Sequence, residues 1–354
     1  MDLWKTLSKT NKTVVMYGMG NGADKILSVC NRYGIEVADF FASDGFVRGQ
    51  SFHGKTVMSF SDVLTKYGKD NIIVLVSFAS SLPDVMNNII YISEVCETYV
   101  PDVPVRGDTL FCDEFEEACK TDIDRAIKLL SDERSRDVFN GVIDFRRSGK
   151  IDYLIQTADT KEDVINKLLD MSSYVSAVDV GAYDGDTARE LLELCPKIKK
   201  VYAFEPDRRN YRKLLAYAST ESRVKAINSA AWNSNTTLIF DDSGNRNAGL
   251  DENGSSKRHA EVEAVALDNV IDERIDYIKY DVEGAEKEAL EGSVQIIKKY
   301  RPDLLISLYH RTEDLHKLIL QVHDICHDYN LYLRRYPYIP AWDLNLYATI
   351  RNVK

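Results

Sequence analysis

The chain has 354 residues, which is enough for two domains of ordinary size, and its 44% hydrophobic content supports a large core. Its 45 basic and 56 acidic side chains give a formal net charge of −11, and no long basic stripe runs along it. This balance argues against a protein that binds nucleic acid through the phosphate backbone.

Cysteine usage and hydropathy indicate the compartment. The six cysteines form no C-x-x-C pair, and the longest apolar run, 72–79, has the length of a strand and is too short for a bilayer. The first fifteen residues lack the apolar core of a signal peptide. We therefore expect reduced thiols and a cytoplasmic protein without a transmembrane segment. The oligomeric state does not follow from the sequence, so a homo-oligomer stays open.

An α/β unit with a parallel sheet is expected over residues 1–110, where apolar runs alternate with helical patterns. Its strands are expected at 13–17, 36–43 and 71–79. The pattern "FSDVLTKYG" predicts a helix, with Ser61 or Asp62 as its N-cap.

The turn after the first strand, "GMGNGA", has the spacing of a dinucleotide-binding turn. Gly18, Gly20 and Ala23 fit G-x-G-x-x-A, and Asp44 follows the second strand, where an acid can hold a ribose. We interpret Gly18, Gly20 and Asp44 as a candidate second nucleotide site for a nucleotide-linked sugar. A purely structural turn is the alternative.

Residues 111–172 are helical in pattern and charged, which predicts a connector without strands. From 173 to 354 a second alternation predicts a larger, doubly wound and mostly parallel sheet. Its strands are expected at 175–180, 200–205, 223–228, 261–267, 275–281, 303–309, 331–336 and 344–350. A single helix is expected over 284–299, and the long polar loop 241–260 is interpreted as a lid or a hairpin tip.

The stretch "AVDVGAYDGDTARELLE" (177–193) is an apolar run that ends in a glycine turn. Gly181 and Gly185 let the backbone turn tightly and approach a ligand, and the start of the next helix favours an anionic or zwitterionic group. The spacing differs from G-x-G-x-x-G, and the carboxylates of Asp179 and Asp186 would repel a pyrophosphate. The turn therefore suits a cofactor with an amino group and a positive centre. A plain turn with acidic helix caps is the alternative.

The ends of the next two strands extend this candidate site. "VYAFEPD" places Glu205 where an acidic side chain accepts both hydroxyls of a ribose. "INSAAW" ends the third strand, at the edge where an adenine ring would lie, so Asn228, Ser229 and Ala230 are its candidate neighbours. Together with the glycine turn, these residues favour a nucleoside cofactor.

Five stretches of residues 174–354 carry a family resemblance: "VDVGAYDGDTARELLE", "VYAFEPD", "SGNRNAGL", "ALDNVIDERIDYIKYDVEGAEKEALEGSVQIIKKYRPDLLISLYHR" and "LYLRRY". They resemble the FkbM family of S-adenosylmethionine-dependent methyltransferases. The resemblance implies a seven-stranded, Rossmann-like methyltransferase sheet and methyl transfer to oxygen, often on a sugar. It implies an active-site role for the Asp281 segment. It implies a cofactor role for the matching Asp179, Gly181, Gly185, Asp186, Thr187 and Glu205.

Methyl transfer requires an aligned acceptor and the removal of a hydroxyl proton. "KYDVEGAE" ends the fourth parallel strand, which places Asp281 at the ligand crevice with Glu283 close behind. "LLISLYHR" brings His310 to the same edge, and its ordinary pKa of about 6.5 suits a proton acceptor. We expect His310 or Asp281 to act as the general base. The alternatives are a structural histidine and, for Glu283 and Glu286, acids at a helix N-terminus.

Metal dependence stays open, because Asp281 is a suitable ligand for a divalent cation. His316, His323 and His327 lie on one helical face without a supporting glutamate or cysteine, so we expect them to be structural or solvent-facing. A cluster of aromatic residues near the C-terminus suits either a sugar or core packing; it comprises Tyr336, Tyr338 and Trp342.

The function predicted from the sequence is S-adenosylmethionine-dependent O-methylation of a sugar in a glycan or in its nucleotide-activated precursor. One alternative is a nicotinamide-dependent oxidoreductase acting through the N-terminal unit. The other is a cofactor-binding scaffold without catalysis. The sequence does not identify the methyl acceptor.

Overall fold

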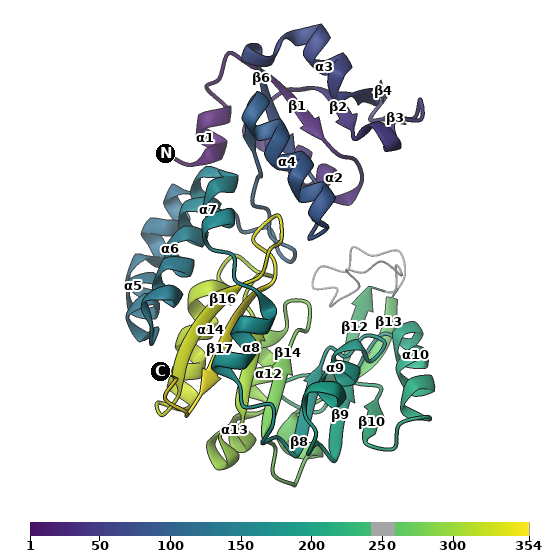
Figure 1. The fold of residues 1–354 in the computed structure, drawn as a ribbon, viewed down its shortest axis with the longest axis vertical. Coiled ribbons are helices and arrows are strands. Elements are labelled where there is room, and N and C mark those ends of the chain that lie inside the picture. The colour runs from purple at the N-terminus through teal and green to yellow at the C-terminus, as the bar shows by residue number, and fades with distance from the viewer. Residues whose placement is uncertain (242–258, 354) are drawn as a thin grey trace.

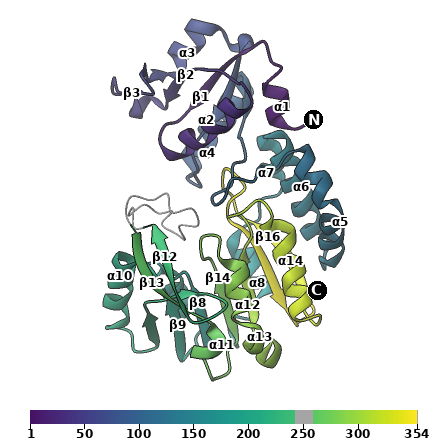
Figure 2. The ribbon, with the colours of Figure 1, turned by 180° about the vertical axis from the view of Figure 1, so that it is seen from behind.

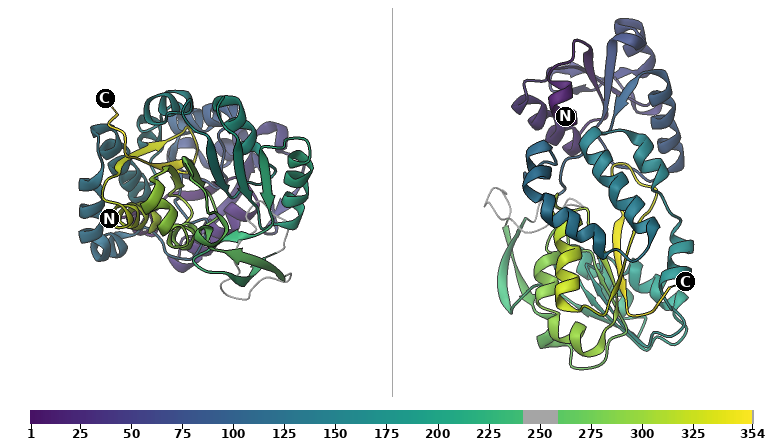
Figure 3. Two further views of the ribbon diagram at one scale, coloured as in Figure 1. Left: turned by 90° about the horizontal axis from the view of Figure 1, so that it is seen from below. Right: turned by 90° about the vertical axis from the view of Figure 1, so that its left-hand side faces the viewer.

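The computed structural model describes residues 1–241 and 259–353. It consists of an N-terminal α/β domain, a helical connector and a larger C-terminal α/β domain (Figure 1). The connector helices run between the two domains, as the side view in Figure 3 shows. Nearly all of the loop predicted at 241–260 lies outside the described residues.

The N-terminal domain has a five-stranded sheet in the order β5-β2-β1-β6-β7, and every neighbouring pair is parallel. The strands are β1 (Thr13–Tyr17), β2 (Val37–Ala42), β5 (Met58–Ser59), β6 (Ile72–Val76) and β7 (Glu97–Tyr99). The helices are α1 (Leu3–Leu7), α2 (Asn21–Arg32), α3 (Phe60–Tyr67) and α4 (Pro83–Val95). A small hairpin, β3 (Ser51–Phe52) with β4 (Lys55–Thr56), and 3-10 turns at Asp44–Phe46 and Lys69–Asn71 complete the domain.

The N-cap of α3 differs from the prediction. Ser59 occupies the cap, its hydroxyl accepts a hydrogen bond from Asp62 N, and the Asp62 carboxylate bonds back to Ser59 N. This is a capping box, so Asp62 is its third helical residue and Ser61 plays no part in it. The helix begins two residues earlier than the polar Ser61 suggested.

The connector contains four helices: α5 (Asp113–Leu129), α6 (Glu133–Ser148), α7 (Ile151–Gln156) and α8 (Lys161–Leu168). Its backbone and side chains bond to the outermost strand of the C-terminal sheet. Ser131 N donates to Leu331 O at 2.8 Å, and Asp159 N donates to Arg335 O at 2.7 Å. The Ser135 hydroxyl accepts from Leu333 N at 2.9 Å. The connector is therefore bonded along the length of that strand.

The C-terminal domain has a seven-stranded sheet in the order β10-β9-β8-β14-β15-β17-β16. The strands are β8 (Ser176–Val180), β9 (Lys200–Phe204), β10 (Val224–Ile227), β14 (Tyr277–Tyr280), β15 (Asp303–Ser307), β16 (Asn330–Arg335) and β17 (Leu344–Thr349). β17 runs opposite to the other six strands, so it pairs antiparallel with both β15 and β16. The mostly parallel, seven-stranded Rossmann-like sheet expected from the sequence is thereby confirmed.

Helices cover both faces of this sheet, as Figures 1 and 2 show from opposite sides. α8, α9 (Asp186–Leu194) and α10 (Arg208–Ala218) lie on one face, and α12 (Glu286–Glu291), α13 (Val294–Tyr300) and α14 (Asp314–Ile325) on the other. A short helix, α11 (Leu267–Val270), precedes β14.

Two features of this domain differ from the prediction. The strand expected at 261–267 is β13 (His259–Val265), which pairs with β11 (Ala230–Ala231) and β12 (Thr236–Asp241) in a separate three-stranded sheet. The helix expected over 284–299 is divided into α12 and α13 at Gly292. A Cβ on Gly292 would lie 1.9 Å from Trp232 O, so the glycine allows this close approach of two backbones.

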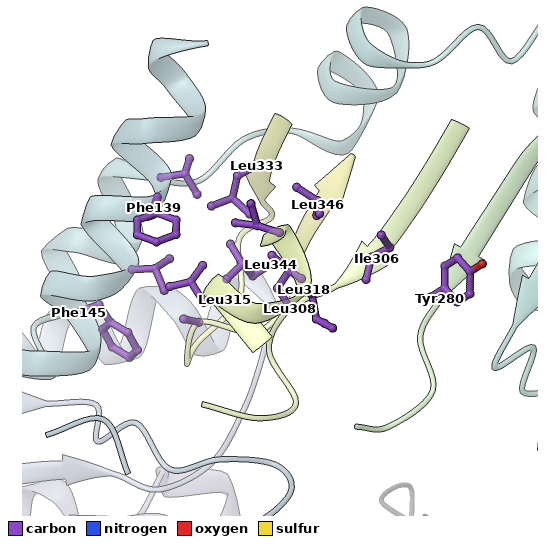
Figure 4. Packing of buried hydrophobic residues seen from close by; sticks show 14 of the residues in the cluster. Phe139, Phe145, Tyr280, Ile306, Leu308, Leu315, Leu318, Leu333, Leu344 and Leu346 are labelled. Atoms are coloured by element: carbon purple, nitrogen blue, oxygen red, sulfur yellow. The ribbon is translucent and has the colours of Figure 1, made fainter. Parts of the chain in front are cut away.

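The largest buried cluster joins the connector to the C-terminal sheet. Figure 4 shows side chains of α6 and α14 packed with those of β15, β16 and β17; Phe139, Ile306, Leu315, Leu333 and Leu346 are among them. Burial of each large apolar side chain contributes about 1.5–3 kcal/mol. The same cluster continues to Val15 and Tyr17 of β1, so one apolar core fixes the N-terminal domain, the connector and the carboxyl ends of the large sheet.

Candidate active site

The turn after β8 lies directly against the loop after β14. Gly181 has a φ of +91°, and a Cβ at this position would lie 1.9 Å from Asp281 O. Its N–H donates to Phe204 O at the end of β9, at 3.1 Å. Only glycine fits both the dihedral angle and the approach, so the sequence of this turn brings the carboxyl ends of β8, β9 and β14 together.

A cavity of about 390 Å³ opens at these strand ends, within the size range of small-molecule sites. We call it the first cavity. Seven of the residues predicted as site residues line it: Gly181, Asp186, Glu205, Ser229, Ala230, Asp281 and Glu283. Tyr183, Trp232 and Leu238 add apolar surface to its walls.

Glu205 is held in this cavity by the backbone. Its Oε2 accepts a hydrogen bond from Tyr183 N and its Oε1 accepts one from Asp207 N, both at 2.8 Å. Burial raises the pKa of Glu205 to about 7. Each carboxylate oxygen keeps a second lone pair, so the side chain can still accept the two hydroxyls of a ribose.

Asn228, predicted as a neighbour of an adenine ring, bonds to the backbone of the turn after β9. Its Nδ2 donates to Glu205 O at 2.8 Å and to Pro206 O at 3.2 Å, and the residue does not line the first cavity. The expected neighbours of an adenine ring that do line the cavity are Ser229 and Ala230. Asn228 thus stabilises the turn that carries Glu205.

Asp179 is fully buried, and neither of its carboxylate oxygens has a hydrogen-bond partner among the described residues. Burial raises its pKa to about 7, and the nearest cation, Lys279 Nζ, lies 3.9 Å away. A buried carboxylate without donors is costly. The residue therefore fits the donor groups of an amino-bearing cofactor.

Lys279 is a member of the site that sequence reasoning missed. It is a neighbour of Asp179 in the pairing of β14 with β8, and its buried Nζ donates to Thr187 Oγ1 at 3.1 Å and lies 3.4 Å from Asp281 Oδ2. The acidic neighbours raise its pKa above the ordinary value, against the effect of burial. A lysine within a strand pattern gives no sequence signal for this role.

Asp281, His310 and Glu286 meet at the ends of β14 and β15. Asp281 Oδ1 accepts from the hydroxyls of Ser307 at 3.0 Å and Tyr309 at 3.2 Å. His310 is 1% exposed; its Nδ1 lies 2.9 Å from Glu286 Oε1, in ion-pair contact whose angle is not that of a hydrogen bond. Its Nε2 lies 3.7 Å from Asp281 Oδ1.

The charges in this cluster set the protonation states. Burial lowers the pKa of His310, but Glu286, Glu283 and Asp281 outweigh it and raise the pKa to about 9. Burial raises the pKa of Asp281, but Lys279 and His310 outweigh it, so the pKa lies below the ordinary value. At neutral pH His310 is therefore protonated and Asp281 is ionised, which favours Asp281 over His310 as the proton acceptor.

Glu286 is more than the helix N-terminal acid expected from the sequence. It is the first residue of α12, but it is only 1% exposed and contacts His310. Its Oε1 accepts from Val282 N at 2.9 Å, so the carboxylate turns back over the loop. Asp281, Glu286 and His310 each place one ligand atom within 4.8 Å of the others, a group that could hold a metal ion.

The segment between the N-terminal domain and the connector reaches this cluster. Arg106 Nε donates to Glu283 O at 3.1 Å, and Arg106 N donates to His310 O at 2.8 Å. Glu283 has a φ of +54°, and a Cβ on Gly284 would lie 2.8 Å from Arg106 Cγ. The two prolines and the glycine of residues 101–108 are typical of a linker or an exposed loop, so the sequence gives no signal for this contact.

A second cavity of about 670 Å³ lies between α8, α9 and the sheet. Asp281 and Asp186 line both cavities, so the two cavities adjoin at these two side chains. Thr187, Lys279, Ser307, Tyr336 and Asn345 line the second one. Of the other two C-terminal aromatics, Tyr338 stacks on Trp342 at 5.7 Å between ring centroids, and Trp342 stacks on Tyr309 at 6.3 Å.

The glycine turn of the N-terminal domain has a packing explanation. A Cβ on Gly18 would lie 2.5 Å from the Phe78 ring, and one on Gly22 would lie 2.4 Å from Ser77 O. Gly20 has nothing within 4 Å of such a Cβ, and Asp44 is exposed after β2. The nucleotide role of Gly18, Gly20 and Asp44 stays a prediction.

The three histidines of the α14 region are not clustered in one site. His316 is buried, 6.0 Å from the Phe115 ring, and burial lowers its pKa to about 4. His323 and His327 lie at the surface, with His327 Nδ1 3.2 Å from His323 Nε2.

None of the helices in the described part of the chain is long and apolar enough to cross a bilayer.

The strand order, the glycine turn and the adjoining cavities define a Rossmann-like methyltransferase domain. Residues 179–339 match the model of the methyltransferase FkbM domain. No curated protein sequence matches the chain.

Among solved structures, the chain is similar to the methyltransferase FkbM from Methylobacillus flagellatus KT, with 20% identity and a TM-score of 0.74, over 98% of this chain and 92% of that one. This likeness shows that the fold extends over both domains and the connector. An rRNA methylase from Streptococcus thermophilus has 17% identity and a TM-score of 0.35, over 53% of this chain and 92% of that one.

Proposed function

We propose that the protein is an S-adenosylmethionine-dependent O-methyltransferase that acts on a hydroxyl of a sugar, in a glycan or in its nucleotide-activated precursor. The observation that carries the proposal is the first cavity, whose wall includes Glu205, an acid that can accept two ribose hydroxyls. The unpartnered Asp179 lies behind the glycine turn and lines neither cavity. An adenosine with a cationic, amino-bearing tail fits both acids. A pyrophosphate does not, since Asp179, Asp186 and Glu205 would repel it.

The acceptor side of the proposal rests on the second cavity. It adjoins the first at Asp281 and offers hydroxyl, amide and charged groups together with the ring of Tyr336. Alternating polar groups and aromatic faces suit the hydroxyls and C–H faces of a sugar. A hydroxyl bound beside Asp281 would face the cofactor across this carboxylate.

The residues of the chain have simple tasks in this reaction. The bound cofactor would supply an electrophilic methyl group on a sulfonium. Asp281 would orient the acceptor hydroxyl and receive its proton as the C–O bond forms and the C–S bond breaks, leaving a neutral thioether. Ser307 and Tyr309 fix the carboxylate, and His310 and Lys279 balance its charge.

Two measurements test the proposal. The first is calorimetric titration of the full chain with S-adenosylhomocysteine and with NAD. Binding of the first ligand without the second is expected, whereas the reverse result would favour a nicotinamide-dependent oxidoreductase. The second is transfer from labelled S-adenosylmethionine to a panel of nucleotide sugars and glycans, where silence despite cofactor binding would favour a non-catalytic scaffold.

A substitution of Asp281 tests its proposed role as the proton acceptor. Asp281→Asn is expected to lower the transfer rate by about a hundredfold or more, because general bases typically contribute that much. Asp324→Asn is the control, since Asp324 is exposed on α14 and pairs with Arg125. A loss of less than about tenfold in Asp281→Asn, with cofactor binding intact, would show that Asp281 is not the base.

A further inference from the structure

Three side chains from three separate segments converge at the edge between the two cavities. Asp281 follows β14, Glu286 begins α12 and His310 follows β15. One ligand atom from each lies within 4.8 Å of the other two. Two carboxylates with one neutral imidazole form a ligand set that suits hard to intermediate divalent cations such as Mn²⁺ and Fe²⁺, and a cation that binds here would displace the proton of His310.

Unpartnered atoms within the cluster point independently to a ligand. His310 Nε2 and Glu286 Oε2 are buried without a hydrogen-bond partner among the described residues, and both side chains are only 1% exposed. His310 Nδ1 is in ion-pair contact with Glu286 Oε1 at 2.9 Å. Leaving such groups unpaired in the interior is costly. One cation bound by His310 Nε2 and by a carboxylate oxygen of Glu286 would satisfy both of these atoms.

The separations between these atoms also fit a shared ion. His310 Nε2 lies 3.7 Å from Asp281 Oδ1, which is too far for a hydrogen bond. Two ligands that are each about 2.1 Å from one ion lie about 3–4 Å apart. The spacing is therefore wide for direct pairing and suitable for coordination.

Neighbouring groups already orient the ligands. Ser307 and Tyr309 donate to Asp281 Oδ1, and Val282 N donates to Glu286 Oε1. Such bonds fix ligand directions around metal ions in proteins. Lys279 Nζ lies 3.4 Å from the other oxygen of Asp281, so Oδ1 is the oxygen that faces His310.

We propose that Asp281, Glu286 and His310 bind one divalent cation of the Mn²⁺ class. Glu283 lies at the border of the site and closes it toward Arg106. The site stands on the geometry of the chain alone. Its role rests on the proposed function: a cation here would bind the acceptor hydroxyl next to the methyl donor and ease the loss of its proton.

The test is titration of the full chain with Mn²⁺, after treatment with a chelator and dialysis, with free Mn²⁺ followed by electron paramagnetic resonance and no cofactor present. One bound ion per chain is expected. Glu286→Gln and His310→Gln are each expected to weaken binding by at least about tenfold, the loss typical of a removed metal-site partner. Circular dichroism confirms that each variant is folded.

A matched control separates this site from adventitious binding at the surface. The His323–His327 pair is the arrangement in the described chain that most resembles a surface chelator, so the double variant His323→Ala/His327→Ala should keep the bound ion. The proposal is overturned if the wild-type chain binds no Mn²⁺. It is also overturned if the double variant loses the ion while Glu286→Gln retains it.

A parallel titration of the same chelated sample with S-adenosylhomocysteine keeps the two proposals apart. Cofactor binding without Mn²⁺ binding would refute the cation site and leave the methyl-transfer proposal intact. Mn²⁺ binding without cofactor binding would do the reverse.

Discussion

Replacing Gly181 by alanine tests the close approach of the glycine turn to the loop after β14. The new Cβ would lie 1.9 Å from Asp281 O, whereas ordinary contact begins at 3.4 Å, so the two strand ends would have to separate. A left-handed φ costs an alanine about 1–2 kcal/mol, and overpacking adds about 1–3 kcal/mol. The combined loss of about 2–5 kcal/mol corresponds to a fall in Tm of roughly 4–20 °C for a domain of this size.

The assay is thermal unfolding by calorimetry together with titration of S-adenosylhomocysteine, and the control is Gly20→Ala. Gly20 has a φ of +96° but nothing within 4 Å of an added Cβ, so it carries the backbone cost alone. Gly181→Ala should lose more stability than the control and bind the cofactor product at least about tenfold more weakly. Equal losses in the two variants, with affinity unchanged in Gly181→Ala, would refute the reasoning.

Three further predictions concern ionisation and capping. Because the pKa of Glu205 is about 7, affinity for S-adenosylhomocysteine should rise between about pH 6 and pH 8 as the carboxylate ionises, and Glu205→Gln should remove this dependence; calorimetry that gives a flat wild-type profile would contradict the ribose role. His316 has a folded pKa of about 4, below that of the unfolded chain, so the folded state binds fewer protons in acid. The free energy of unfolding should therefore fall by up to about 1.4 kcal/mol for each pH unit between about pH 6.5 and about pH 4, measured by urea denaturation, and His316→Gln should flatten the slope. Ser59→Ala should lower stability by about 1 kcal/mol in the same assay because it removes the N-cap of α3, whereas an equal loss in Ser61→Ala would restore the original assignment.

Most of the secondary structure could be predicted from local sequence patterns. The strands around β1, β8 and β15 were predictable because apolar runs of strand length alternate with amphipathic stretches and glycine turns. The separate sheet of β12 and β13 was not, because strand pairing depends on which edge each strand reaches and the alternation is the same in both sheets.

The residues around the first cavity could be named from sequence because each follows a strand, and the carboxyl ends of parallel strands meet. Arg106 could not be named in this way. It lies 177 positions from Glu283 in the sequence, and its contact depends on how residues 101–108 cross the loop after β14. Glu286 occupies the helix start that its position indicates, but its burial depends on the turn at Gly284, whose φ is +96°. The neighbouring carboxylates, which outweigh the effect of burial, likewise changed the interpretation of His310 from proton acceptor to imidazolium.

The bonds between the connector and β16 have a consequence for how the protein can be divided. β16 is the last strand of its sheet, and an uncovered strand of this kind presents unpaired N–H and C=O groups that attract other chains. Ser131, Ser135 and Asp159 cover these groups within the same molecule. A fragment of residues 173–354 would keep every residue of the first cavity but would lose this cover. Self-association through β16 is therefore expected to limit the solubility of the fragment before any loss of activity can be measured.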